Sequence, residues 1–192
     1  MMDGLEALQV LTRIRTDEIV VLSESTRQDW PPLSTKPDLD IGITGSMSKA
    51  SSFGLGLALA RPDVRVWVLD TDGAMLMNMG SLVSTASAGP ANLVHFLYDN
   101  GAYDTTGGQP TPGSRKVNFG EIAMAAGYRR AVTFESVEAL AREIEDVLEG
   151  PLPALVWLKV ASRGRRADMR MKRMRESFVT IRDYLAAHPP AR

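Results

Sequence analysis

Two short polar segments in this chain have the residue types that hold a metal-bridged diphosphate. They are Asp70-Thr71-Asp72-Gly73-Ala74 and Asp99-Asn100-Gly101-Ala102-Tyr103. Each directly follows an apolar run with the composition of a buried strand, residues 64–69 and 93–98. Carboxylate, amide and carbonyl oxygens are the ligands that Mg²⁺ prefers, and glycine lets the backbone approach a phosphate. The two segments therefore predict a magnesium–diphosphate site.

The elements that must position these segments alternate along the chain. Near-continuous apolar runs predict strands at residues 18–22, 64–69, 93–98 and 155–160. Apolar periodicity or small-residue composition predicts helices at residues 3–15, 48–60, 76–88, 119–127 and 136–148. Pro- and Gly-rich residues predict loops at 23–40 and 99–118. This alternation predicts an α/β fold, a parallel sheet with helices on both faces, whose ligands bind beyond the carboxyl ends of the strands.

The composition excludes several other kinds of chemistry and location. The 192 residues include no cysteine, so disulfides, thiolate catalysis and zinc-thiolate sites are excluded. The only histidines are His188 and His95, and His95 lies in an apolar run where a core or interface position is expected. A net charge of −1 gives no bias towards nucleic acid or anionic membranes. Because no apolar run approaches a membrane span and no signal-peptide pattern is present, we expect a cytoplasmic protein.

The two polar segments resemble the motif of thiamine-diphosphate-dependent enzymes, in which a Gly-Asp-Gly turn precedes an Asn-Asn pair. Here Asp72-Gly73 precedes Asn100 by a similar interval. The resemblance implies that Mg²⁺ is bound by Asp72, Asn100 and the carbonyl of Ala102. Other residues implied around thiamine diphosphate are Thr71, Gly73, Ala74 and Tyr103. Thr71 replaces the first glycine of the motif and Asp99 replaces its first asparagine.

A third segment, Gly45-Ser46-Met47, resembles the pyrimidine-binding element of the same family. In that element the glycine carbonyl accepts a hydrogen bond from the aminopyrimidine, and a large apolar residue wedges between the two rings. The resemblance implies these roles for Gly45 and Met47, and it includes Ser46 among the cofactor-binding residues. Met47 could instead be a core residue, because methionine fills irregular gaps. The whole resemblance covers roughly residues 18–160.

Three stretches resemble sulfopyruvate and phosphonopyruvate decarboxylases within this family. They are Gly45-Ser46-Met47 with Ala50-Ser51-Ser52, the stretch Met77-Asn78-Met79-Gly80-Ser81-Leu82, and Gly107-Gly108-Gln109-Pro110-Thr111. These enzymes remove CO₂ from three-carbon 2-oxo acids that carry a sulfonate or a phosphonate. The resemblance implies substrate contacts from Asn78, Thr106 and Gln109. Asn78 could instead be a helix-surface residue, and Thr106 and Gln109 could instead be polar loop residues.

The family's catalytic glutamate lies on a different domain, which faces this one across a subunit interface. Glu18 and Glu24 are the only glutamates between the first predicted helix and Glu121, and neither has the family context for that role. The resemblance therefore implies no catalytic residue in this chain. It implies the β subunit of a hetero-oligomer with an even number of chains, whose α subunit carries the pyrimidine-binding domain.

Two other functions stay open at this stage. One is an acetolactate-synthase-like subunit or a decarboxylase for another 2-oxo acid. The other is a cofactor-binding regulatory subunit without turnover, which the departures at Thr71, Asp99 and Lys49 would fit. A dinucleotide site is not expected, because Leu59 occupies the third glycine position after Gly54-Leu55-Gly56.

The C-terminal part of the chain is rich in arginine and lysine from residue 163 to residue 175. We predict a thiamine-diphosphate-binding domain at residues 1–165 and a basic helix and tail at residues 166–192. The basic face could be solvated, could contact an acidic partner, or could attract an anionic substrate. Nucleic-acid binding is not expected, because the overall charge is balanced and aromatic residues are not interleaved with the basic ones.

Overall fold

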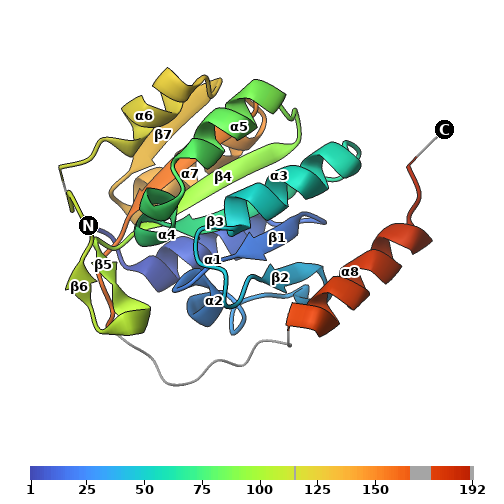
Figure 1. Cartoon of the computed structure of the whole chain (residues 1–192), viewed down its shortest axis with the longest axis horizontal. Helices are drawn as coiled ribbons and strands as arrows, with labels where there is room; N and C mark the ends of the chain where they lie inside the picture. Colours follow the sequence, from blue (N-terminus) through green and yellow to red (C-terminus); the bar gives the residue numbers. More distant parts are fainter. Residues whose placement is uncertain (115, 165–173, 191–192) are drawn as a thin grey trace.

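A computed structural model describes residues 1–114, 116–164 and 174–190. Its centre is a six-stranded sheet with the strand order β2-β1-β3-β4-β8-β7, in which every neighbouring pair is parallel (Figure 1). The strands are β1 (Ile19–Leu22), β2 (Asp40–Gly42), β3 (Val66–Thr71), β4 (Leu93–Asp99), β7 (Arg130–Phe134) and β8 (Ala154–Lys159). The prediction of an α/β fold with a parallel sheet is confirmed.

Helices cover both faces of the sheet (Figure 1). On one face α1 (Gly4–Ile14) packs against α7 (Val137–Leu148); on the other α5 (Gly80–Ala88) lies between α3 (Ala50–Ala60) and α6 (Phe119–Ala126). The strands serve both faces because successive side chains point to opposite sides. Val20 and Leu22 of β1 join the core under α1 and α7, whereas Ile19 and Val21 join the core under α3. This two-sided burial explains the near-continuous apolar runs.

The remaining described elements are short, except for the last helix. They are α2 (Thr26–Asp29), the 3₁₀ helix η1 (Pro37–Leu39), α4 (Asp72–Met77), β5 (Ala102–Tyr103), the 3₁₀ helix η2 (Asp104–Thr106), β6 (Gln109–Pro110) and α8 (Met174–Ala187). Strands β5 and β6 form a small antiparallel hairpin inside the predicted loop 99–118. Within the described ranges, no helix combines the length and the apolarity that crossing a bilayer requires.

The prediction that residues 23–40 form a surface loop is wrong. This segment contains α2, η1 and the start of the edge strand β2, and its Trp30 is fully buried. Strand β2 was missed because it is short and includes a charged residue, Asp40. That carboxylate is buried in an ion pair with Arg15, 2.8 Å between Nη1 and Oδ1, so its charge is compatible with the sheet.

Two further predictions of single elements need correction. Strand β7 was missed because it lies at the opposite edge of the sheet, where its residues are mostly half-buried and the apolar pattern is weak. The predicted helix 76–88 is two helices: α4 begins earlier, at Asp72, and α5 begins at Gly80. Asn78, between them, has φ −148° and ψ 52°, which is not helical.

Helix α8 packs on the sheet domain at the β2 edge, where it contacts β2 and η1 (Figure 1). Phe178 stacks on Phe53 of α3 with ring centroids 5.1 Å apart, and Ile181 is buried in the same core. Arg61, after α3, donates to the carbonyl of Leu185 at 3.0 Å. The apolar face of α8 therefore belongs to the same hydrophobic core as α3. The basic residues predicted between 165 and 173 lie outside the described residues.

Candidate functional site

The candidate site lies at the edge of the sheet where β1, β2, β3 and β4 end. These four strands are parallel neighbours, so the loops that follow them leave from the same edge. The loop after β2 carries Gly45-Ser46-Met47, the segment after β3 begins at Asp72, and the segment after β4 begins at Asn100. All three segments that the sequence singled out therefore come from one edge of the fold.

Asp72 is almost fully buried in the candidate site, at 1 % exposed. Its Oδ2 accepts a 2.7 Å hydrogen bond from the hydroxyl of Thr111, while its Oδ1 is buried without a hydrogen-bond partner of ordinary geometry. Burial, followed by the negative charge of Asp99, raises the pKa of Asp72 to about 7. The Thr111 hydroxyl and nearby backbone N–H groups offset only part of this shift. A buried carboxylate with one unpartnered oxygen fits a metal ligand.

Asn100 is held by hydrogen bonds at both ends of its amide group. Its Nδ2 donates to Asp104 Oδ2 at 2.9 Å, and its Oδ1 accepts from the N–H of Ala102 at 3.0 Å. The backbone N–H of Asn100 also lowers the pKa of the Asp72 carboxyl, so the main chain of Asn100 lies near that carboxyl. Ala102, whose carbonyl is the third predicted ligand, begins the β5–β6 hairpin.

Asp99 anchors the turn that carries Asn100. Its Oδ2 accepts from the indole Nε1–H of Trp157 at 2.8 Å, and its Oδ1 accepts from the N–H of Gly101 at 3.1 Å. Gly101 has φ +70°, a conformation that favours glycine. The replacement of the family's asparagine by Asp99 therefore leaves a side chain that still accepts the N–H bonds of this turn.

Gly73 needs to be a glycine because of its contact with the hairpin. A Cβ at this position would lie 2.5 Å from Cε1 of Tyr103, closer than real Cβ atoms approach other atoms. The ring of Tyr103 thus lies directly against the segment that follows β3. Ala74 is fully buried beside it. Thr71 has an extended backbone, φ −116° and ψ 155°, so its replacement of a glycine causes no backbone strain.

The predicted pyrimidine-binding segment is more exposed than the segments after β3 and β4. Gly45 and Ser46 are exposed, Met47 is half-buried, and Gly45 has φ +69°. The turn closes through the N–H of Lys49, which donates to the carbonyl of Ser46 at 3.2 Å. It also contacts the next segment, because Asn78 Nδ2 donates to the carbonyl of Ser48 at 3.2 Å.

The three predicted substrate residues do not lie in one place. Asn78 contacts the turn after Gly45, and so belongs to the candidate site. Thr106 and Gln109 are exposed on the hairpin and contact each other: Gln109 Nε2 donates to the Thr106 carbonyl at 3.4 Å. Thr106 and Gln109 therefore lie at the exposed surface and not beside the buried Asp72 and Asn100.

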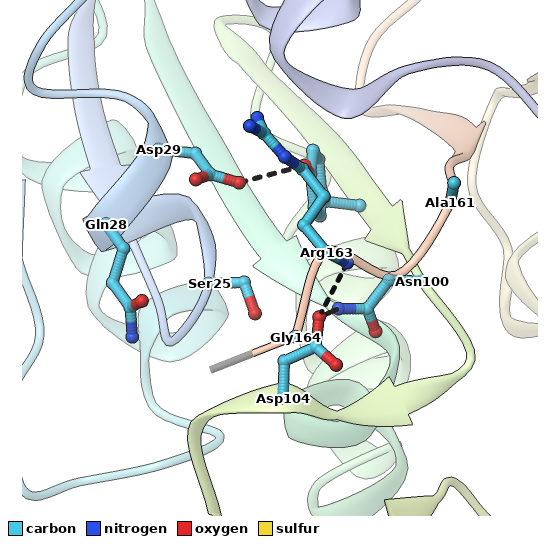
Figure 2. A pocket seen from close by; sticks show the side chains of 9 residues that line it. Ser25, Gln28, Asp29, Asn100, Asp104, Ala161, Arg163 and Gly164 are labelled. Atoms are coloured by element: carbon cyan, nitrogen blue, oxygen red, sulfur yellow. Dashed lines mark hydrogen bonds between the residues drawn. The ribbon is translucent and has the colours of Figure 1, made fainter. Parts of the chain in front are cut away.

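Two hollows flank Asn100. A cavity of about 210 Å³ is lined by Asp99, Asn100, Trp157 and Lys159 among others. The smaller hollow in Figure 2, of about 10 Å³, is lined by Asn100, Asp104 and Arg163 with residues of α2. Among the described residues, no three His, Cys, Asp or Glu side chains cluster closely enough to hold a metal ion. A metal at Asp72 would therefore need amide, carbonyl or phosphate oxygens as its other ligands.

Sequence reasoning assigned no role to two residues that contact the predicted ligands. Thr111 binds Asp72 from 39 residues away, and Asp104 binds Asn100 from four residues away. Both lie in the long Gly- and Pro-rich segment after β4, and its unusual length was the available signal. Their partners depend on how the β5–β6 hairpin folds back, which no local pattern reveals.

A chain of buried polar groups lies next to the site. Ser23 Oγ donates to Asp70 Oδ1 at 2.8 Å, and Asp70 Oδ2 lies 3.5 Å from Nε2 of His95. The other ring nitrogen of His95, Nδ1, lies 3.0 Å from the hydroxyl of Tyr128. His95 is 1 % exposed, in agreement with the expected core position.

The fold and the site define a cofactor-binding α/β domain, and comparison with known proteins identifies its family. The model described as "Thiamine pyrophosphate enzyme, C-terminal TPP binding domain" matches residues 33–158. The chain therefore belongs to the thiamine pyrophosphate enzyme family and contains its C-terminal cofactor-binding domain.

Two curated relatives have similar identity but different lengths. Phosphonopyruvate decarboxylase of Streptomyces viridochromogenes is 36% identical over 154 residues, which are 79% of this chain and 38% of that protein. Sulfopyruvate decarboxylase subunit beta of Methanothermobacter thermautotrophicus is 37% identical over 164 residues, 83% of each chain. The chain thus spans well under half of the first relative and most of the second.

A solved structure supports the fold. Thiamine diphosphate-dependent 4-hydroxybenzoylformate decarboxylase of Rhodococcus jostii superimposes with a TM-score of 0.68 and 18% identity. The match covers 83% of this chain and 32% of that one.

Proposed function

We propose that this chain is the β subunit of a two-chain decarboxylase that depends on thiamine diphosphate and Mg²⁺. Its substrate would be a three-carbon 2-oxo acid with a sulfonate or phosphonate group, sulfopyruvate or phosphonopyruvate. The observation that carries the proposal is the buried Asp72, with one unpartnered oxygen and the backbone N–H of Asn100 nearby, in a chain of this family. The names and lengths of the relatives support the substrate class and the subunit role.

In this proposal the metal is held by Asp72, Asn100 and the carbonyl of Ala102. A cation beside Asp72 would lower its raised pKa and keep the carboxylate ionised at neutral pH, because an opposite charge favours the charged form. Thr111 would hold the second carboxylate oxygen, and so set which oxygen faces the metal.

The other predicted residues would orient the cofactor. Gly45, Ser46 and Met47 would contact the pyrimidine end, while Thr71, Gly73, Ala74 and Tyr103 would surround the diphosphate. The close contact between Gly73 and Tyr103 supports this arrangement, because it leaves no space for a side chain between the segment and the hairpin. When bound, thiamine diphosphate supplies the electron sink that accepts the electron pair left as CO₂ departs.

Asn78, Thr106 and Gln109 are proposed substrate contacts, with Asn78 best placed by its contact with the turn after Gly45.

The partner would be an α subunit that contributes the catalytic glutamate and the pyrimidine-binding domain, in an assembly with an even number of chains. Exposed apolar side chains on neighbouring helices support a protein partner: Met77 before α5, Val83 on α5 and Met124 on α6 are each about half exposed. Large apolar side chains exposed on neighbouring helices are a common feature of protein interfaces.

Calorimetry on the chain alone, and on the chain purified with its partner, tests the cofactor part of the proposal. Thiamine diphosphate should bind only with Mg²⁺, and Asp72→Ala should abolish that binding. The absence of binding by the complete complex would refute the cofactor assignment.

Release of CO₂ by the complete complex tests the substrate part. Sulfopyruvate or phosphonopyruvate should be decarboxylated faster than pyruvate. Turnover of pyruvate alone, with acetolactate as product, would instead identify an acetolactate-synthase-like subunit.

A further inference from the structure

We propose that Asp104 is a positioning residue that sets the orientation of the Asn100 amide. Figure 2 shows the Asp104 carboxylate facing the Asn100 side chain and the backbone of Arg163. The inference deepens the proposed function and rests on it, because it concerns the residue proposed as the amide ligand of Mg²⁺. It adds a residue outside the motif that identified the metal ligands.

Three donors converge on the Asp104 carboxylate. Oδ2 accepts from Asn100 Nδ2 at 2.9 Å and from the N–H of Arg163 at 3.3 Å, and Oδ1 accepts from Ser162 Oγ at 2.7 Å. The carboxylate is 6 % exposed, and Asn100 is 5 % exposed. Both side chains are therefore shielded from water that could replace these partners.

The chemistry of the two side chains determines which end of the amide faces Asp104. An ionised carboxylate can only accept hydrogen bonds, so the amide must turn its NH₂ group towards it. The amide oxygen of Asn100 then points to the other side, where it meets the N–H of Ala102. A cation binds the oxygen of an amide and is repelled by its NH₂ group. Asp104 thus favours the orientation of Asn100 that is compatible with a metal ligand.

Asp104 also connects the Asn100 segment to the chain that leaves the sheet after β8. Ser162 and Arg163 lie shortly after that strand, which ends at Lys159, and both bind the Asp104 carboxylate. Two roles must therefore be separated by experiment: the orientation of the Asn100 amide, and the attachment of the segment after β8. Ser162 allows this separation, because its hydroxyl binds Oδ1 while Asn100 binds Oδ2.

The decisive variant is Asp104→Asn in the complete complex, with calorimetric titration of Mg²⁺ in the presence of thiamine diphosphate. Asparagine keeps the size of the side chain but can donate as well as accept, so the Asn100 amide loses its single preferred orientation. We expect the dissociation constant for Mg²⁺ to increase about 10- to 100-fold, as for other residues that orient metal ligands. Ser162→Ala is the matched control, and its dissociation constant should stay within about twofold of wild type.

The outcomes separate this inference from the proposed function. If the wild-type complex does not bind Mg²⁺ with the cofactor, the proposed function and this inference both fail. If the wild type binds and Asp104→Asn binds equally well, only the inference fails. If Ser162→Ala weakens binding as much as Asp104→Asn, attachment of the segment after β8 explains the effect, and the orientation role is overturned.

A crystal structure of the wild-type complex with Mg²⁺ and thiamine diphosphate gives a test that needs no variant to fold. We expect Asn100 Oδ1 to face the metal and Nδ2 to remain on Asp104. An Asp104 carboxylate that binds the metal directly, or an Asn100 amide without contact to Asp104, would overturn the proposal.

Discussion

Replacing Asp72 with asparagine removes a buried negative charge with almost no change in shape. In the metal-free protein this carboxyl is 1 % exposed, and burial and the charge of Asp99 raise its pKa to about 7 from an ordinary value of 3.8. We expect Asp72→Asn to stabilise the metal-free protein at pH 8, and to abolish Mg²⁺-dependent cofactor binding. A residue that weakens the fold but is needed for binding is typical of functional sites.

The magnitude follows from the linkage between protonation and folding. A carboxyl whose pKa is raised in the folded state binds its proton more tightly there, so the protonated form favours folding. This contribution is complete below about pH 4, declines as the pH rises, and is lost above about pH 7. About three pH units at about 1.4 kcal/mol per unit give about 4 kcal/mol in total. Asparagine stays neutral and does not lose this contribution.

Urea unfolding in the presence of a chelator measures the effect. Between pH 5 and pH 8, the stability of Asp72→Asn relative to wild type should increase by about 2.5 kcal/mol. Asp146→Asn, an exposed aspartate on α7, is the control, and its relative stability should not change over this range. An Asp72→Asn difference that is the same at both pH values would refute the reasoning, because it would show that burial does not disfavour the Asp72 charge.

Two further predictions concern the packing that supports the site. A Cβ at Gly54 would lie 2.2 Å from Cγ2 of Val68, whereas one at Gly56 meets nothing within 4 Å. Urea unfolding should show Gly54→Ala destabilising by about 1–3 kcal/mol and Gly56→Ala stabilising by about 0.5–1 kcal/mol; equal effects would contradict this packing of α3. Arg15→Met leaves the buried Asp40 charge without its ion pair and should cost about 3–5 kcal/mol in the same assay. Adding Asp40→Asn should recover part of that loss, and no recovery would show that the ion pair is not the cause.

The sheet could be predicted where its strands are buried on both faces. The apolar runs 64–69 and 93–98 correspond closely to β3 (Val66–Thr71) and β4 (Leu93–Asp99), because a central strand needs apolar residues at nearly every position. The edge strands β2 and β7 escaped prediction because each has only one neighbour in the sheet. An edge strand can include charged or polar residues, and these residues interrupt the apolar run by which a strand is predicted from sequence.

The candidate site divides in the same way. Asp72-Gly73 and Asn100 could be picked out because each follows a strand, and local sequence reveals that position. Asp104 and Thr111 could not, because their contacts with those residues depend on a hairpin that folds back over the site. The unusual length of the segment that contains Asp104 and Thr111 indicated a functional loop, but it did not indicate which of its residues contact the site.

By itself, the sequence determined the positions of the buried central strands and of the segments after them that carry chemistry. Strand burial and turn chemistry are properties of short segments, so they can be read from neighbouring residues. Only the tertiary structure decided that α8 joins the core beside β2, that Arg15 neutralises Asp40, and that Asp72 is left with one unpartnered oxygen. Each of these features depends on contacts between residues that are distant in the sequence, and such contacts form only when the chain folds.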